Sequence, residues 1–185
     1  MKGERSRAVI ALGSNIAHEG LSGAALIRKA CDALQDCGFV LCAKSGIWES
    51  APWPPEPHLV TQPAYVNAIV VGELEARAPD VIVRDLHALE ARFGRTRRKK
   101  WQARTLDLDL IDLDGRVENF TIERIAGSEE GAVILPHPHA HERAFVLAPL
   151  AEAAPAWRHP VLDKTAAELL AGLPPGQTLR RLTKI

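Results

Sequence analysis

Hydrophobic and polar positions along this chain repeat with two different periods, and each period predicts a different kind of element. An alternation with period two, or a short continuous apolar run, is typical of a strand with one or both faces buried. Apolar residues spaced three or four apart instead share one face of a helix. The first pattern predicts strands over residues 7–12, 39–48, 65–74 and 105–113, with a last edge strand over 177–183.

The helical spacing occurs twice in the first half of the chain and again near its end. Over 21–37 and over 80–93 the apolar stripe is followed directly by a glycine, the residue that commonly ends a helix. Shorter helices are predicted over 143–153 and 165–173. The order strand, helix, strand, strand, helix, strand is that of a ferredoxin-like fold, and the two later helices are able to cover the second face of its antiparallel sheet. We therefore expect an α+β sandwich with helices on both faces.

Composition adds limits to this picture. A chain of 185 residues with 46% hydrophobic and 25% charged residues suits one globular domain, expected to span 1–185. The formal net charge is zero, so no global field draws the chain to nucleic acid or to a membrane. Cys31, Cys37 and Cys42 show no Cys-x-x-Cys spacing and fall on apolar segments, which indicates reduced core thiols. With no pattern of a signal peptide or membrane span, we expect a cytoplasmic protein.

Charge is concentrated in one stretch, residues 93–113. It begins with a dense group of cations, which suits the binding of several phosphates. It continues into a strand whose alternation places Asp107 and Asp109 on one face and leucines on the other. Two carboxylates side by side repel each other unless a cation such as Mg²⁺ lies between them, so the stretch predicts metal-assisted phosphoryl chemistry. The cations are Arg95, Arg97, Arg98, Lys99, Lys100 and Arg104.

Each of these features also has an ordinary explanation. A basic run is often a solvated loop or a nucleic-acid patch, and an Asp-x-Asp strand can be an edge with polar residues facing water. Their adjacency favours catalysis, because a cationic loop leading into an acidic pair has no obvious structural purpose. The alternating His137, His139 and His141 suggest zinc, but prolines interrupt the extended geometry and no Cys or Glu completes a ligand set.

A second candidate site lies on the predicted strand 65–74. Tyr65 and Asn67 share one face of it, so an aromatic plane stands beside an amide that can both donate and accept hydrogen bonds. That pair suits a flat heterocycle with polar edges, although spacing alone equally describes two ordinary residues on a half-exposed strand. The preceding loop, residues 52–63, is rich in proline, which excludes regular structure, and loops of this length are usually functional.

Four separated motifs resemble those of one known family. Residues 97–111 carry the core Trp-x-x-Arg-x-Leu-Asp-Leu-Asp-Leu-Ile, which is similar to the signature of the 6-hydroxymethyl-7,8-dihydropterin pyrophosphokinases of folate biosynthesis. Leu-Gly-Ser-Asn at 12–15, Gln-Pro-Ala-Tyr-Val-Asn at 62–67, and Leu-Pro-His-Pro at 135–138 followed by Arg-Ala-Phe at 143–145 agree in the same order. The resemblance implies a transferase, a kinase that moves pyrophosphate from ATP to a pterin alcohol and releases AMP.

The resemblance also implies which residues act at the nucleotide. Asp107 and Asp109 are expected to hold two Mg²⁺ ions that bridge the triphosphate, and Arg95 and Arg104 to contact the phosphates during transfer. Trp101 is expected to close the basic loop over the site. The residues implied for ATP binding are His87, Glu90, Arg97, Lys100, Leu110, His137 and Arg143.

The implied pterin slot draws on distant parts of the chain. Tyr65 and Phe145 are expected to stack on the two faces of the ring, and the proline-rich loop to close over the substrates. No nucleic acid or membrane partner is implied, and we expect a monomer acting on small molecules. The residues implied for pterin binding are Ser50, Ala51, Trp53, Tyr65, Asn67, Trp101 and Phe145.

The chain departs from the family pattern in four places. Gln102 stands where a glycine often follows the tryptophan, and the spacing from Arg97 to Trp101 is one residue shorter than in some members. Ala51 occupies a place where proline is common, and the segment 116–134 is longer than usual. Two rivals remain open: an RNA-binding module, which would need more sheet-face aromatics for stacking bases, and a different nucleotidyl enzyme, which would lack the Tyr-x-Asn pair.

Overall fold

The computed structural model describes residues 3–53, 62–95, 104–120 and 132–185. These ranges contain a six-stranded sheet in which all pairings are antiparallel. Its strands are β1 (Arg5–Ser14), β2 (Val40–Lys44), β3 (Gly46–Ser50), β4 (Tyr65–Glu75), β5 (Asp107–Leu113) and β6 (Leu179–Lys184). They follow the order β5-β1-β4-β3-β6, and β2 pairs with a further segment of β4. The order and direction of the strands confirm the ferredoxin-like prediction.

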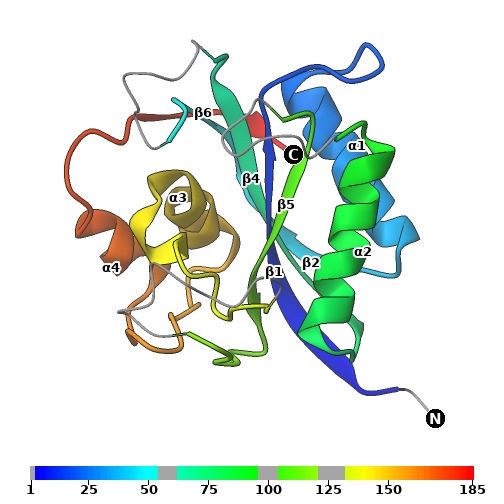
Figure 1. Cartoon of the computed structure of the whole chain (residues 1–185). Coiled ribbons are helices and arrows are strands. Elements are labelled where there is room, and N and C mark those ends of the chain that lie inside the picture. Colours follow the sequence, from blue (N-terminus) through cyan, green and yellow to red (C-terminus); the bar gives the residue numbers. More distant parts are fainter. Residues whose placement is uncertain (1–2, 54–61, 96–103, 121–131) are drawn as a thin grey trace.

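Helices cover both faces of this sheet. Figure 1 shows α1 (Gly23–Asp36) and α2 (Pro79–Arg92) side by side on one face, and α3 (Ala144–Ala153) and α4 (Ala166–Ala171) on the other. A short 3-10 helix, η1 (Ala140–Glu142), leads into α3. The α+β sandwich is therefore confirmed. No helix in the described ranges combines the length and the apolar composition that crossing a membrane requires.

Strands buried on both faces divide the core into two layers. On β1, Ala8, Ile10 and Leu12 face the layer under α1 and α2, whereas Val9 faces the layer under α3 and α4. β5 and the residue before it follow the same rule, since Leu106, Leu108 and Leu110 join the first layer. The predicted alternation of aspartate and leucine is thus confirmed, because the leucines occupy the buried face.

Two expectations from the sequence need correction. The predicted strand 39–48 is two strands, because the buried Ser45 hydroxyl accepts a hydrogen bond from the Ile69 N–H at 2.9 Å and interrupts the ladder between β2 and β3. Cys31 is a buried thiol, but Cys37 and Cys42 are exposed, because one follows the last turn of α1 and the other lies on the outward face of β2. All three are free thiols.

A buried histidine lies in the segment between α3 and α4. Nδ1 of His159 accepts hydrogen bonds from the N–H groups of Val161 and Leu162, both at 3.2 Å, so its proton is on Nε2 in the neutral ring. The rings of Phe120, His141 and Trp157 surround it at centroid distances of 5.5 to 5.9 Å. Burial, assisted by His141, lowers the pKa of His159 to about 4.

Acid should therefore destabilise the fold through His159. In the unfolded chain the ring takes up a proton near pH 6.5, whereas the folded ring resists protonation until about pH 4. Its contribution is complete above pH 6.5 and is lost as the pH falls to about 4, by at most about 3 kcal/mol. Urea unfolding of the protein and of His159→Gln between pH 7 and 4 tests this. The difference in unfolding free energy should shrink with acid, and parallel curves would contradict it.

Candidate active site

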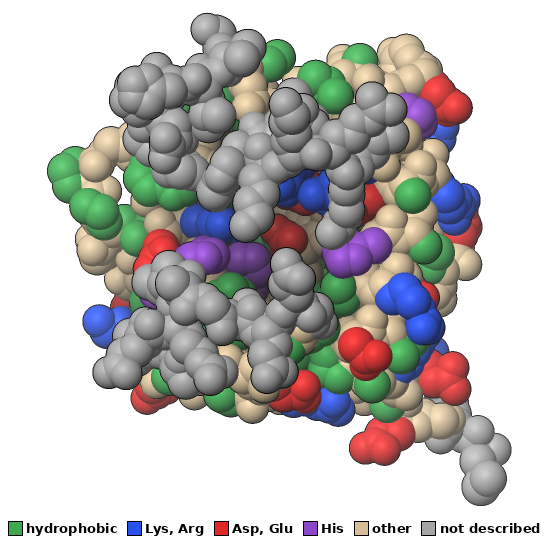
Figure 2. Space-filling view, viewed as in Figure 1, with side chains coloured by type: hydrophobic (Ala, Val, Ile, Leu, Met, Phe, Trp, Pro, Cys, Tyr) green, Lys and Arg blue, Asp and Glu red, His purple; other side chains and the backbone are tan. Residues whose placement is uncertain are grey.

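A pocket opens where the ends of β1, β3, β4 and β5 meet the start of α3. Figure 2 shows acidic, basic and histidine side chains gathered around a hollow in this face of the molecule. The pocket combines charged groups from β5 and its approach with polar and aromatic groups from β3, β4 and α3. Its lining includes Gly13, Ser50, Ala51, Trp53, Gln62, Tyr65, Asn67, Arg104, Asp107, Asp109, Arg143 and Phe145.

Gly13 on β1 keeps the floor of the pocket open. It pairs with Asn67 of β4 on one side and with Asp107 of β5 on the other, so these three residues stand abreast in the sheet. A Cβ at position 13 would lie 3.6 Å from the Cβ of Asp107 and 3.7 Å from Oδ1 of Asn67. A side chain there would fill the space between the acidic and the amide-bearing ends of the pocket.

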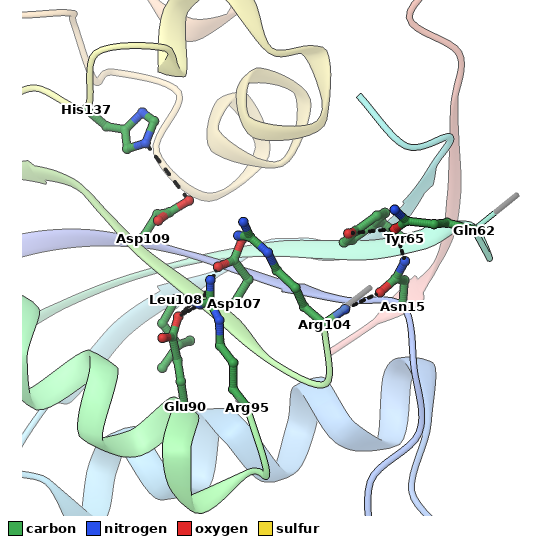
Figure 3. A network of polar contacts seen from close by, with 10 residues as sticks. All are labelled: Asn15, Gln62, Tyr65, Glu90, Arg95, Arg104, Asp107, Leu108, Asp109 and His137. Carbon is green, nitrogen blue, oxygen red and sulfur yellow. Dashed lines mark hydrogen bonds and ion pairs between the residues drawn. The ribbon is translucent and has the colours of Figure 1, made fainter. Parts of the chain in front are cut away.

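The acidic pair, Asp107 and Asp109, forms one end of the pocket. Oδ1 of Asp107 binds the Arg95 guanidinium at 2.6 Å, and Oδ2 binds that of Arg104 (Figure 3). Asp109 has a different neighbour, because its Oδ2 lies 4.0 Å from Nε2 of His137. Burial alone would lower the pKa of the Arg104 guanidinium, but contact with Asp107 outweighs burial and raises it. The structure thus brings four predicted catalytic residues together.

Glu90 lies beneath this end of the pocket and joins α2 to β5. Its carboxylate is almost fully buried, and Oε1 accepts a hydrogen bond from the Leu108 N–H at 2.8 Å while also binding Arg95 (Figure 3). His87 lies one turn earlier on the helix and is half-buried. The Leu110 side chain is in the core, so a nucleotide contact at that position would be made by its main chain.

Arg143 and His137 approach the acidic pair from the α3 side. Burial lowers the pKa of the Arg143 guanidinium, although Asp109 and Asp107 oppose that effect. Within the described parts of the chain, this guanidinium lies 5.7 Å from the centre of the Phe145 ring and has no hydrogen-bonded carboxylate. Burial, with Arg143 nearby, lowers the pKa of His137 to about 3, so the ring is neutral at pH 7. Arg143 is therefore a partly buried cation that an anionic ligand would stabilise.

The other end of the pocket combines aromatic and amide groups. Nδ2 of Asn67 donates to Oγ of Ser50 at 3.0 Å, and both residues are buried. Tyr65 and Phe145 come from β4 and α3 and line the same pocket, beside Trp53. Burial raises the pKa of the Tyr65 hydroxyl, which therefore stays protonated at neutral pH. All predicted pterin-binding residues within the described ranges thus meet here.

Asn15 and Gln62 join the two ends of the site, and neither was among the predicted site residues. Oδ1 of Asn15 accepts from the Arg104 N–H at 2.6 Å, and its Nδ2 donates to Oε1 of Gln62 at 3.2 Å. The Tyr65 hydroxyl reaches the same Gln62 oxygen at 3.4 Å (Figure 3). Asn15 ends the Leu-Gly-Ser-Asn motif and Gln62 begins the Gln-Pro-Ala-Tyr-Val-Asn motif, so these motifs are the signal in the sequence for both residues. Arg97, Lys100 and Trp101 lie outside the described residues.

The pocket of this α+β fold carries carboxylates and guanidinium groups at one end, and aromatic and amide groups at the other. This arrangement is typical of an enzyme that transfers phosphoryl groups. The family model of 7,8-dihydro-6-hydroxymethylpterin-pyrophosphokinase (HPPK) matches residues 9–155, and the chain belongs to this family.

Relatives support this assignment. A Mycobacterium leprae 2-amino-4-hydroxy-6-hydroxymethyldihydropteridine pyrophosphokinase is 32% identical over 96% of this chain and 91% of its own length. A Synechocystis enzyme of the same name is 39% identical over 59% of this chain and half of its own length. A crystal structure of Plasmodium falciparum HPPK-DHPS with pteroate matches 92% of this chain and 43% of that chain, with a TM-score of 0.64 and 14% identity. At that identity the structural match bears on the fold alone, and it agrees with the observed sheet.

Glu90→Gln should destabilise the protein by about 1 to 3 kcal/mol, because the variant keeps an acceptor for the Leu108 N–H but loses the charge that binds Arg95 inside the structure. Glu73→Gln is the matched control, since Glu73 forms an exposed pair with Arg5 at 3.7 Å and its loss should cost less than about 1 kcal/mol. Urea unfolding measures both changes. Equal losses would show that the buried carboxylate has no special role in stability.

Proposed function

We propose that this chain transfers the pyrophosphoryl group of ATP to the hydroxymethyl oxygen of 6-hydroxymethyl-7,8-dihydropterin, a step of folate biosynthesis, and releases AMP. The observation that carries the proposal is one pocket in which Asp107 and Asp109 stand at one end and Tyr65 and Asn67 at the other. A polyanion bound at the first end and a flat heterocycle at the second would meet above Gly13. Membership of the family supplies the identity of the two substrates.

The donor set at the acidic end fits magnesium. Two carboxylates on one face of β5 offer hard oxygen ligands. Among the described residues, no group of three or more His, Cys, Asp or Glu side chains is placed to hold a metal by itself, so further ligands would have to come from outside these residues. Mg²⁺ typically binds one or two carboxylates and takes its other ligands from phosphates and water. We assign two Mg²⁺ ions to Asp107 and Asp109. When bound, they would supply neutralisation of the triphosphate charge.

The arginines would bind the phosphates around this pair. Arg95 and Arg104 already lie against Asp107, within reach of a polyphosphate held there, and Arg143 approaches from the opposite wall. Of the remaining ATP-binding assignments, His87 and Glu90 lie on α2 beside β5, and Glu90, whose carboxylate is buried, would act by holding Arg95. A guanidinium offers paired donors in a fixed plane, which suits bidentate contact with phosphate oxygens. The assigned ATP-binding residues are His87, Glu90, Arg97, Lys100, Leu110, His137 and Arg143.

Transfer then requires position rather than a protein nucleophile. The hydroxymethyl oxygen releases its proton to solvent and forms a bond to the β-phosphorus, as the bond from that phosphorus to the AMP oxygen breaks and AMP leaves with its electron pair. Tyr65 and Phe145 would hold the ring between them, and Asn67 and Ser50 would pair with its polar edge. This fixes the angle at which the oxygen meets the phosphate, and the surrounding guanidinia stabilise the charge that redistributes during transfer.

We further infer that residues 1–185 form one domain that works as a monomer in the cytoplasm. The three free thiols support a reducing compartment, and the small-molecule substrates require no protein partner. Sedimentation of the purified protein would check the oligomeric state.

One assay tests the proposed reaction directly. The protein is incubated with ATP and Mg²⁺, with and without hydroxymethyldihydropterin, and the nucleotide product is identified. AMP formed only with the pterin, and abolished by a chelator, supports the proposal. Pyrophosphate release would favour a nucleotidyl enzyme, and salt-sensitive RNA binding without turnover would favour the RNA-binding alternative.

Replacing either Asp107 or Asp109 with Asn should lower turnover by about 100-fold or more, since each change removes charge from the metal-binding end while relieving repulsion within the pair. Circular dichroism should show that the fold persists. Asp163→Asn provides the control, because its carboxylate is 88% exposed and lies outside the pocket. Near-normal activity of both single variants would overturn the metal assignment.

Truncating Tyr65 or Phe145 to Ala should weaken pterin binding by about 1 to 3 kcal/mol through loss of one stacking face, with ATP affinity nearly unchanged. The two losses should be non-additive, because a ring that has lost one wall can tilt away from the other. Calorimetric titration of each ligand into the single and double variants measures this. Equal weakening of ATP and pterin would mean that these residues support the fold rather than the slot.

A further inference from the structure

The side chain of Gln177 joins the C-terminal segment to the main chain around Arg143. Its Oε1 accepts a hydrogen bond from the Ala144 N–H at 2.8 Å, and its Nε2 donates to the Glu142 carbonyl, also at 2.8 Å. One carboxamide therefore binds the peptide groups on both sides of Arg143. Gln177 lies beyond residues 9–155, the part of the chain that the family model matches.

This contact supplies what the start of α3 lacks. The first N–H groups of a helix have no acceptor within the helix, and the N-cap residue of α3, Arg143, makes no capping hydrogen bond with its own side chain. Gln177 provides the acceptor for Ala144 from another part of the chain. By also binding the Glu142 carbonyl, it pairs with the main chain as a neighbouring strand would, and Arg143 between these groups is extended at φ −115° and ψ 108°.

Two side chains at the start of α3, those of Arg143 and Phe145, reach the pocket. Arg143 is the N-cap residue and Phe145 the second residue of the helix, and both line the pocket. Because a helical side chain follows the backbone that carries it, the directions of both depend on where α3 begins. Gln177 also lies beside Phe145, Ser50 and Trp53 in a small adjoining cavity. The carboxamide thus stands behind the aromatic wall of the pterin end.

The segment that carries Gln177 is itself anchored. β6 begins two residues later and pairs with β3, with Leu179 opposite Ser50. Further along β6, Arg181 binds Glu152 of α3 at 2.6 Å, and Glu152 also accepts from Nε1 of Trp48 at 3.1 Å. α3 is therefore bound to the C-terminal segment both at its start and near its end.

We propose that Gln177 is a positioning residue for the transfer reaction, which fixes the start of α3 so that Arg143 and Phe145 face the substrates. Gln177 itself acts through these two residues and needs no contact with the reacting atoms. This inference rests on the function proposed above, in which Arg143 binds ATP and Phe145 stacks on the pterin.

Gln177→Met tests the inference, because methionine keeps the length of the side chain and removes both hydrogen bonds. Arg180→Ala is the matched control, since it breaks the exposed Arg180–Glu49 pair of the same segment, at 2.8 Å, without touching α3. Pterin and ATP affinities are measured by calorimetry, kcat and KM by AMP release, and stability by thermal unfolding. Q177M should lower kcat/KM for the pterin by about 5- to 20-fold, as expected for two lost hydrogen bonds. R180A should leave kcat/KM for the pterin unchanged, even if it lowers the unfolding temperature as much as Q177M does.

The double variant Q177M/F145A separates positioning from stability. If Gln177 acts through Phe145, the double variant should bind the pterin no more weakly than F145A alone. Fully additive losses, or the same kcat/KM in Q177M and wild type, would overturn the inference. If F145A and Arg143→Ala themselves leave both ligands and turnover unchanged, it is the proposed function of the site that fails.

Discussion

β1 pairs with β4 on one side and with β5 on the other, and the register of these two ladders determines where the functional side chains stand. Asn67, Gly13 and Asp107 lie abreast across the three strands. A shift of either ladder by one residue would turn its polar residue, Asn67 or Asp107, toward the core and an apolar neighbour toward the pocket. The burial of both faces of the sheet opposes such a shift, because it would expose apolar side chains in two layers at once.

The electrostatics of the site are local in a chain with no net charge. Asp107 is balanced by two guanidinia, whereas Asp109 and Arg143 face the same pocket without a direct hydrogen bond to each other in the described structure. Glu90 supports this arrangement from below, because it binds Arg95 and the β5 main chain together. The charges at the acidic end are thus held by the protein before any ligand arrives, which reduces reorganisation during transfer.

The second helical layer contributes the opposite wall of the pocket. α3 carries Arg143 and Phe145 at its start, and it packs on the sheet face that Val9, Ile69 and Val71 make apolar. A ferredoxin-like sheet with helices on one face alone would leave this apolar surface exposed and the acidic pair open to water. The same packing therefore completes the core and encloses the site.

The sequence by itself determined the kinds of element, the alternation that places Asp107 and Asp109 on one face, and the family, because these depend on local periodicity and on motifs of adjacent residues. Only the tertiary structure decided the contacts between distant side chains. Ser45 divides a predicted strand through a hydrogen bond to Ile69, Asn15 binds the main chain of Arg104, and Gln177 binds the start of α3. Such contacts join residues 24 to 89 positions apart, and no local pattern encodes a partner at that separation.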